Sequence, residues 1–324
     1  MEGEGTADPA IVVQGLRMDY GGFRAVDGLS FHVNRGEIYA LLGANGAGKT
    51  STVEILEGHR KRTGGLVRVL GYDPGTGGRH LRERIGIVLQ SGGMDTELTV
   101  QEMVSLYAGF YARPRAVDET IEQVGLGGKR RARTRTLSGG QLRRLDVALA
   151  LIGDPELLFL DEPTTGFDPR ARRDSWDMIA GLRHAGTTIL LTSHYLDEVQ
   201  RLADRVGVMS HGQLVEESTP ASLGGRDVAG TVISFRLPPG LSPGALPGGP
   251  WDLPERPGGA ISMHTDEPTR VLAVLTDWIV RHGAELDDLT VTRLSLEEAY
   301  LQVTGHARPA AAPGEASQGG SSAR

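Results

Sequence analysis

The segment with the clearest chemistry is the glycine-rich loop Gly43–Thr50, which reads GANGAGKT. Its glycines would let successive backbone N–H groups face an anion, and a helix beginning there would add the partial positive charge of its N-terminus. Lys49 could reach the β- and γ-phosphates of a nucleotide, and the Thr50 hydroxyl could ligate Mg²⁺. The pattern therefore predicts a nucleoside triphosphate site, although a glycine-rich turn with a solvated lysine is the simpler alternative.

Two adjacent carboxylates, Asp161 and Glu162, follow the apolar run Leu157–Leu160. Consecutive residues of a strand point to opposite sides, so the two acids can have different roles. Asp161 is suited to hold Mg²⁺, directly or through water, and Glu162 to orient and deprotonate an attacking water. The alternative interpretation is an ordinary solvated acid pair at the end of a strand.

A rigid frame must position these groups, and apolar runs indicate where its strands lie. Three segments are continuously apolar or nearly so: Ile38–Leu42, Leu157–Leu160 and Thr188–Thr192. This pattern is typical of strands that are buried on both faces of a parallel sheet. Ile11–Leu16 and Leu29–Val33 are predicted to be short strands separated by a turn at the glycines that follow Tyr20.

Helical patterns alternate with these strands. Thr50–Glu57 is a predicted helix with Gly58 as its stop. Gln101–Tyr111 is a second predicted helix, with apolar residues expected on one face at Met103, Leu106, Tyr107 and Phe110. The alternation predicts an α/β sheet core with an inserted helical part.

Leu137–Gln141 reads LSGGQ and precedes the acid pair. With the phosphate loop before it, this order closely resembles the ATP-binding-cassette (ABC) ATPase family, over roughly Ile11 to Pro220. The resemblance implies a P-loop NTPase cassette of class α/β, with a mixed sheet core, an antiparallel β subdomain and a helical subdomain inserted at about 91–155. It also implies ATP and Mg²⁺ as cofactors.

Further positions match family motifs residue by residue. Tyr20 matches the aromatic residue that stacks on adenine. Gln90 matches the Q-loop glutamine, and His194 matches the switch histidine that contacts the γ-phosphate. Asp168 matches the D-loop, with Phe167 where the family usually has Leu. The resemblance implies catalytic residues Glu162, His194 and Gln90; metal ligands Thr50, Gln90 and Asp161; and nucleotide contacts Tyr20, Gly43, Ala44, Asn45, Gly46, Ala47, Gly48, Lys49, Thr50, Ser51, Ser138, Gly139, Gly140, Gln141 and Asp168.

Family cassettes work as head-to-tail dimers with ATP between two subunits. By this resemblance, Ser138 and Gly140 of one chain would meet the γ-phosphate held by Lys49 of the other. A serine hydroxyl and a glycine backbone before a helix are physically suited to bind phosphate. A homodimer is therefore expected.

A second, small α/β domain is expected beyond Gly224, so the predicted domains are a leader 1–10, a cassette 11–223, an accessory domain 224–305 and a disordered tail 306–324. The accessory domain would contain three strands and two helices, at Thr231–Leu237, Ala260–His264, Pro268–His282, Leu289–Leu294 and from Ser295 onwards. Ser295 and Glu298 are spaced as a capping box at the start of the last helix.

The stretch Leu289–Gly305 resembles the end of cassettes from drug-resistance-type exporters. This resemblance implies an ATPase subunit that powers a separately encoded membrane permease, with a drug or antibiotic as the cargo. Two alternatives stay open: an ABC importer ATPase, and a non-transport ABC ATPase that acts as a nucleotide switch.

The composition excludes several classes of site and binding partner. The chain has 324 residues, a net charge of −7 and no cysteine. The missing thiols exclude disulfides, thiolate metal sites and cysteine nucleophiles, and the acidic balance argues against nucleic-acid binding. No apolar run approaches the 18 or so residues of a membrane span, and no secretion signal opens the chain. We therefore expect a cytoplasmic protein that reaches the cytoplasmic face of the membrane only through its permease.

Overall fold

The computed structural model describes residues 8–88, 95–226, 231–247, 249, 251–253, 259–293 and 295–305. Gln90, the first seven residues and the expected tail lie outside these ranges. Ala10, which the sequence assigned to the leader, is buried, and its carbonyl accepts a hydrogen bond from the N–H of Leu70 at 2.7 Å. The folded part therefore begins before Ile11.

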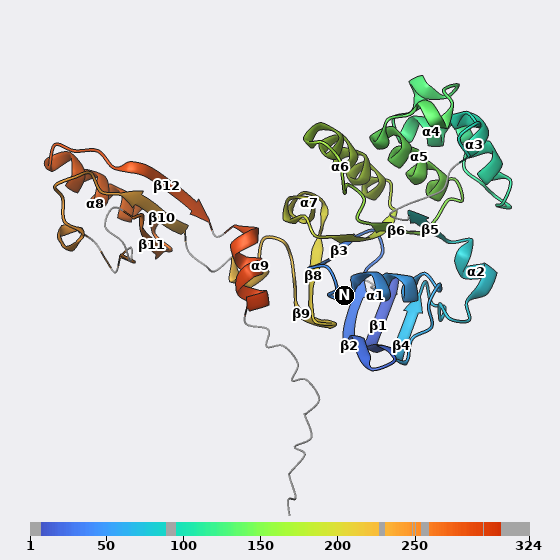
Figure 1. The fold of residues 1–324 in the computed structure, drawn as a ribbon, viewed down its shortest axis with the longest axis horizontal. Coiled ribbons are helices and arrows are strands. Elements are labelled where there is room, and N and C mark those ends of the chain that lie inside the picture. Colours follow the sequence, from blue (N-terminus) through green and yellow to red (C-terminus); the bar gives the residue numbers. More distant parts are fainter. Residues whose placement is uncertain are drawn as a thin grey trace, which may run out of the picture.

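A six-stranded sheet forms the centre of the cassette (Figure 1). Its strands lie in the order β5 (Ile85–Val88), β6 (Leu157–Asp161), β7 (Thr188–Ser193), β3 (Ile38–Gly43), β8 (Arg205–Ser210) and β9 (Gln213–Ser218). The first five are parallel, and β9 runs antiparallel to β8. The prediction of a mixed sheet core is confirmed, although the pattern analysis had not identified β8 or β9.

Side-chain alternation explains why β3 is apolar throughout. Ile38, Ala40 and Leu42 belong to one core cluster, whereas Tyr39 and Leu41 belong to another on the opposite face. Helices α5 (Gly139–Leu151), α6 (Pro169–His184) and α7 (Leu196–Leu202) contribute to the first cluster, and α1 (Lys49–Leu56) to the second. A strand covered on both faces has no solvent side for polar residues.

An antiparallel sheet, in the order β2 (Phe23–Val33), β1 (Ile11–Tyr20) and β4 (Gly64–Val69), packs with α1 on the second face of the central sheet. The two predicted strands and the turn between them are present, but both strands are longer than predicted, because β1 and β2 form a continuous hairpin around Gly21 and Gly22. Antiparallel sheets can keep one face in water, so charged residues in the middle of these strands do not interrupt them.

The inserted helices α3 (Val100–Ala108) and α4 (Val117–Gln123) gather with α5 beyond the β5 edge of the sheet, and the short α2 (Gly78–Arg82) precedes β5 (Figure 1). The predicted apolar face of α3 was wrong in part. Leu106 and Phe110 are 52% and 69% exposed, whereas Val100, Met103 and Val104 are buried. A capping box at Thr99 begins α3, and Val100, Met103 and Val104 pack into the core cluster, which sets the covered face of the helix.

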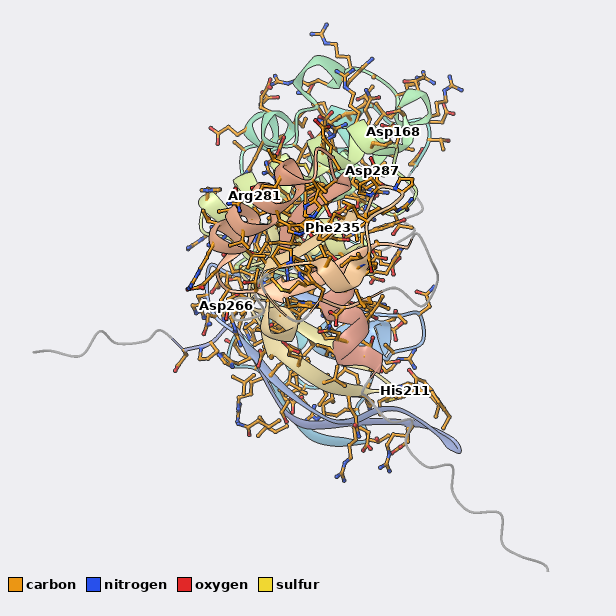
Figure 2. All side chains as sticks on the ribbon, turned by 90° about the vertical axis from the view of Figure 1, so that its left-hand side faces the viewer. Asp168, His211, Phe235, Asp266, Arg281 and Asp287 are labelled. Carbon is orange, nitrogen blue, oxygen red and sulfur yellow. The ribbon has the colours of Figure 1, made fainter. Side chains whose placement is uncertain are left out.

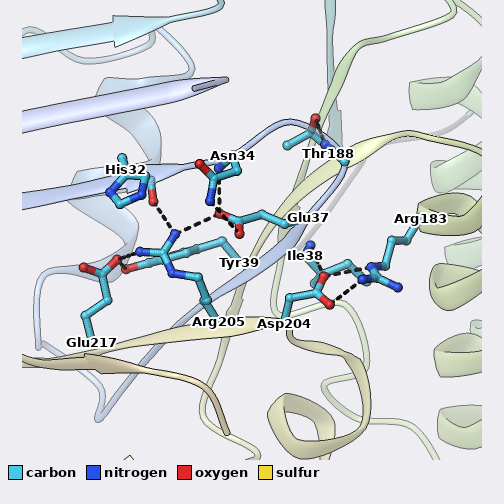
Figure 3. Close-up of polar contacts among 11 residues, drawn as sticks. His32, Asn34, Glu37, Ile38, Tyr39, Arg183, Thr188, Asp204, Arg205 and Glu217 are labelled. Carbon is cyan, nitrogen blue, oxygen red and sulfur yellow. Dashed lines mark hydrogen bonds and ion pairs between the residues drawn. The ribbon is translucent and has the colours of Figure 1, made fainter. Parts of the chain in front are cut away.

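Polar contacts hold the start of β3, at the end opposite to the glycine-rich loop (Figure 3). Arg205 pairs with Glu37 at 3.0 Å and also with Glu217. Asp204 accepts a hydrogen bond from the Ile38 N–H at 2.9 Å and pairs with Arg183. These contacts fix β3 against β8 and α6, so the loop that follows β3 leaves from a rigid strand.

The accessory sheet has the order β11 (Ile261–Thr265), β10 (Thr231–Arg236), β12 (Asp287–Arg293), and both pairings are antiparallel. The helix α8 (Pro268–Arg281) covers one face over a small core that includes Phe235, Ile261 and Leu275. Figure 1 shows this unit beside the cassette, and Figure 2 turns it toward the viewer with Phe235 and Arg281 labelled.

The last described helix, α9 (Leu296–Gly305), returns to the cassette. The predicted capping box is confirmed, since the Ser295 N–H donates to Glu298 Oε2 at 2.8 Å and the Glu298 N–H to Ser295 Oγ at 3.1 Å. Leu296 is buried in the cassette's core cluster, and Tyr300 and Val303 pack against that cluster. Although α9 follows the accessory sheet in sequence, it packs on the cassette.

Candidate nucleotide site

The glycine-rich loop connects β3 to α1, as its sequence predicts, and close packing explains two of its glycines. A Cβ atom at Gly43 would lie 2.6 Å from the Met209 carbonyl oxygen. Gly48 has a φ of 103° at the N-terminus of α1, and a Cβ there would lie 2.5 Å from the Ala25 carbonyl oxygen. The loop can follow this path only without side chains at these positions.

Replacing Gly43 by alanine tests this packing. We expect Gly43→Ala to lower the free energy of unfolding by about 1–3 kcal/mol, because the added methyl must displace backbone atoms. Gly22→Ala is the matched control, since a Cβ at Gly22 would meet nothing within 4 Å. Urea unfolding of both variants measures the difference, and equal stability for the two would contradict the packing argument.

Lys49, the first residue of α1, is buried with its side chain directed at the loop. Its Nζ donates to the carbonyl oxygens of Gly43 at 2.7 Å and of Ala44 at 3.2 Å. Burial lowers the pKa of Lys49, while the carboxylates of Glu162 and Asp161 act to raise it. The ammonium group thus lies near both the phosphate loop and the acid pair.

A hollow of about 470 Å³ opens in front of the loop, and this volume is within the usual range for small-molecule sites. It is lined by residues from β1, β2, the loop, α1 and the acid pair: Tyr20, Phe23, Ala25, Asn45, Gly46, Gly48, Lys49, Thr50, Ser51 and Glu162. The Tyr20 hydroxyl lies 3.0 Å from Ser51 Oγ, and the Arg60 guanidinium lies 5.0 Å from the centre of the Tyr20 ring.

The acid pair occupies the end of β6 in an unusual conformation. Glu162 has a φ of 45°, which side-chain-bearing residues adopt only at a cost and which is common at functional sites. Its N–H donates to Thr192 Oγ1 at 3.1 Å, and the Thr192 hydroxyl donates to Asp161 Oδ1 at 2.5 Å. Thr192 therefore holds both acids from the neighbouring strand β7.

His194 and Thr165 approach the Glu162 carboxylate from its two sides. His194 Nδ1 lies 3.2 Å from Oε1, and the Thr165 hydroxyl donates to Oε2 at 3.1 Å. The Glu162 side chain is only 14% exposed, whereas that of His194 is 33% exposed. A carboxylate held in this way, at the edge of the hollow, can accept a proton from a water placed there.

The LSGGQ segment and Asp168 do not line the hollow. Ser138 begins α5 through a capping box with Gln141, and neither residue lines the hollow. Asp168 begins α6, where its Oδ1 accepts hydrogen bonds from the N–H groups of Ala171 and Arg170, which lower its pKa. Within the described part of one chain, these residues and the loop do not form one site; Gln90 lies outside that part.

Sequence reasoning missed three contributors. Phe23 lines the hollow, and Thr192 holds the acid pair. The buried Arg143, two residues beyond the LSGGQ segment, donates to the carbonyl oxygen of Asp161 at 2.8 Å and links α5 to the acid pair. The Thr192 role follows from β6–β7 pairing, which places Thr192 opposite Asp161. That register could be inferred only with both strands already assigned.

The donor chemistry fits Mg²⁺. Across the described residues, no group of three or more His, Cys, Asp or Glu side chains could hold a metal alone. Mg²⁺ prefers oxygen ligands and is usually held by one or two protein groups together with waters and substrate phosphates. The Thr50 hydroxyl and the Asp161 carboxylate are oxygen donors of this kind.

Comparison with known proteins identifies the class. Residues 26–165 match the ABC transporter family, and residues 231–295 match the C-terminal domain of ABC transporter domain-containing protein-like sequences. The chain is 38% identical over 309 residues to the daunorubicin/doxorubicin resistance ATP-binding protein DrrA of Streptomyces peucetius, covering 92% of this chain and 93% of that protein. It therefore belongs to the ABC transporter ATP-binding proteins and is an ATP-hydrolysing enzyme of the drug-resistance type.

Other relatives agree with this assignment. The Nod factor export ATP-binding protein I of Ralstonia nicotianae is 33% identical, over 92% of this chain and 94% of that protein. The solved structure of cbiO1 from Clostridium perfringens, part of the ABC transporter complex cbiONQ, is similar with a TM-score of 0.63 and 30% identity, covering 67% of this chain and 90% of that chain. In the described ranges of the present chain, no helix is long and apolar enough to cross a membrane.

Proposed function

We propose that this chain is the ATP-binding and ATP-hydrolysing subunit of a bacterial exporter whose cargo is a drug or antibiotic. In this proposal it acts on the cytoplasmic face of the membrane and powers a separately encoded permease. The observation that carries the catalytic part is the hollow at which Lys49, Tyr20 and Glu162 converge. The export direction and the cargo rest on the names of the drug-resistance and Nod factor export relatives.

In this site different groups of the chain bind different parts of MgATP. The loop N–H groups and the Lys49 ammonium hold the phosphates, and the Tyr20 ring stacks on adenine. Thr50 and Asp161, with Gln90, would hold Mg²⁺, and the ion would neutralise phosphate charge. Lys49 already lies against loop carbonyl oxygens, so it reaches the phosphates with little rearrangement.

Hydrolysis then depends on Glu162. Its carboxylate orients the attacking water and takes its proton, while Thr192 and Thr165 fix its position. His194, 3.2 Å from the same carboxylate, orients the water and contacts the γ-phosphate. Arg143 holds the backbone on which the acid pair sits, through the carbonyl oxygens of Asp161 and Pro163.

Ser138 and Gly139 are exposed at the N-terminus of α5, away from the hollow of their own chain. We propose that they close the hollow of a second copy in a head-to-tail homodimer. The N-terminus of a 13-residue helix favours an anion there, and a small hydroxyl and glycines allow close approach.

A second hollow, of about 330 Å³, is the proposed docking site for a cytoplasmic segment of the permease. It lies between β5 and the inserted helices, and its apolar lining includes Ile87, Tyr107, Tyr111 and Leu149. Phe110, on the same segment as these tyrosines, is 69% exposed and packs edge-on against Tyr107. The hollow also adjoins the end of β5, where Val88 lines it.

Co-expression with the permease tests both parts of the proposal. We expect the pair to co-purify from detergent, and Phe110→Asp to reduce recovery of the complex about tenfold or more by placing a charge in an apolar contact. Val280→Asp is the matched control, because Val280 is also an exposed apolar residue, on α8. Equal recovery with Phe110→Asp would contradict the docking site.

Transport direction is tested in membrane vesicles that contain both proteins. Inside-out vesicles should accumulate a drug of the daunorubicin type on addition of MgATP. Accumulation only in right-side-out vesicles loaded with ATP would indicate an importer, and ATP hydrolysis without any associated permease would indicate a nucleotide switch.

A further inference from the structure

A fully buried carboxylate, which the proposed hydrolysis does not use, joins three segments of the cassette. Glu198 lies in the first turn of α7 and is 0% exposed. Its Oε1 accepts hydrogen bonds from the Thr164 hydroxyl at 2.7 Å and from the indole N–H of Trp176 at 3.1 Å. Thr164 belongs to the loop between β6 and α6, and Trp176 belongs to α6. One oxygen atom of α7 therefore holds both that loop and the helix that follows it.

The second oxygen of this carboxylate makes the arrangement costly for the fold. Glu198 Oε2 is buried and has no hydrogen-bond partner among the described residues. A buried polar atom without a partner destabilises a folded protein, more so when the group is charged. Departures of this kind from the usual rules of packing are found most often at functional sites. The carboxylate thus calls for an explanation beyond stability.

One of its contacts leads to the Glu162 carboxylate. Thr164 is fully buried, and the next residue, Thr165, donates its hydroxyl to Glu162 Oε2 at 3.1 Å. The Thr165 N–H also donates to the Glu162 carbonyl oxygen at 3.3 Å. Because Glu162 has a positive φ, its conformation persists only with support from its surroundings. Holding Thr164 in place therefore holds the loop that supports Glu162.

The helix that carries Glu198 leads to His194. α7 begins two residues after His194, and the centres of the His194 and Tyr195 rings lie 4.0 Å apart. The Tyr195 carbonyl oxygen accepts a hydrogen bond from the Val199 N–H at 3.3 Å, which ties this residue to the first turn of α7. Glu198 thus connects the two segments whose side chains, Glu162 and His194, meet at 3.2 Å.

We propose that Glu198 is a positioning residue that keeps the Glu162 carboxylate and the His194 ring in the relative placement needed for hydrolysis, by holding the loop at Thr164 against α7. This inference rests on the proposed role of Glu162 as the base. Glu198 and Thr164 do not line the nucleotide hollow, so their influence is on turnover rather than on ATP binding.

The first test uses the full chain and the variant Thr164→Val, which is nearly isosteric and removes the hydroxyl that Glu198 binds. We expect kcat to fall about 5- to 50-fold, because a small misplacement of a catalytic group is costly, while Kd for MgATP stays within about twofold. Trp176→Phe is the matched control, since it removes the other hydrogen bond to the same oxygen. Its kcat should stay within about twofold, even where its Tm falls as much as that of Thr164→Val.

A second pair of variants tests the carboxylate itself. Glu198→Gln keeps an acceptor oxygen for Thr164 and Trp176, so its kcat should stay within about threefold of wild type. Glu198→Ala removes that acceptor, and its kcat should fall at least as much as that of Thr164→Val. Equal loss of activity in the glutamine and alanine variants would contradict a role through this acceptor.

The outcomes separate this inference from the site on which it rests. If Glu162→Gln loses hydrolysis while Thr164→Val keeps wild-type kcat, only the role of Glu198 is wrong. If Glu162→Gln hydrolyses ATP normally, the proposed base itself is wrong. Losses of kcat in Thr164→Val and Trp176→Phe that simply follow their losses of Tm would show that Glu198 serves the fold alone.

Discussion

Glu162→Gln is expected to bind MgATP with nearly wild-type affinity and to hydrolyse it about 10²–10⁴ times more slowly, the usual effect of losing a general base. The amide can still hydrogen-bond the attacking water and His194, but it cannot accept a proton. The change is nearly isosteric, so the contacts from Thr192 to the Glu162 backbone and from Thr165 to its side chain can persist.

Phosphate release and ATP binding, measured on the same preparation, test this expectation. Because bound ATP would no longer be consumed, the variant should also stay dimeric in MgATP during size-exclusion chromatography. Glu119→Gln, the same replacement on an exposed position of α4, is the control and should behave like wild type. Turnover near the wild-type rate in Glu162→Gln would mean that another group is the base.

Ser138→Arg is expected to leave ATP binding by the single chain intact and to reduce hydrolysis about 10²-fold or more. A long cationic side chain cannot fit where a small hydroxyl and a glycine backbone must approach a phosphate. The variant also loses the capping box of α5, which costs about 1 kcal/mol. Thr99→Arg removes the equivalent capping box of α3, and it is therefore the matched control for stability.

Mixing two inactive variants distinguishes a shared site from a single-chain site. Lys49→Ala removes the cation beside the loop and should abolish tight ATP binding. In a mixed dimer with Ser138→Arg, both changes fall in one composite site and the other site is intact. The mixture should therefore recover ATPase activity that neither variant has alone. No recovery, together with an active Ser138→Arg variant, would contradict the shared site.

The fold was predictable where the hydrophobic pattern was unambiguous. β3, β6 and β7 are buried on both faces, and each appears in the sequence as a continuous apolar or nearly apolar run. β1 and β2 are partly exposed to solvent and contain charged residues. The hydrophobic pattern therefore identified only part of each strand. For α3, the helical period showed which residues share a face but not which face is covered, and the packing of Val100, Met103 and Val104 against the core decided that question.

For the site, the sequence predicted which residues are chemically suited to act, and the structure brings several of them to one hollow. Lys49, Tyr20 and Glu162 converge there, although they lie in three separate segments. Ser138 and Asp168 do not, and their proposed roles depend on a second chain.

The central place of β3 in the sheet has a consequence for biosynthesis. β3 is made early, but its neighbours β7 and β8 come much later; the contact from Ile38 to Asp204 alone spans 166 positions. At about 5–20 residues per second, a ribosome needs on the order of ten seconds or more to make that stretch. During this time the nascent chain carries an apolar strand with no partner. We expect chaperones that shield apolar segments to bind the unfinished chain, and overproduction without them to yield aggregates.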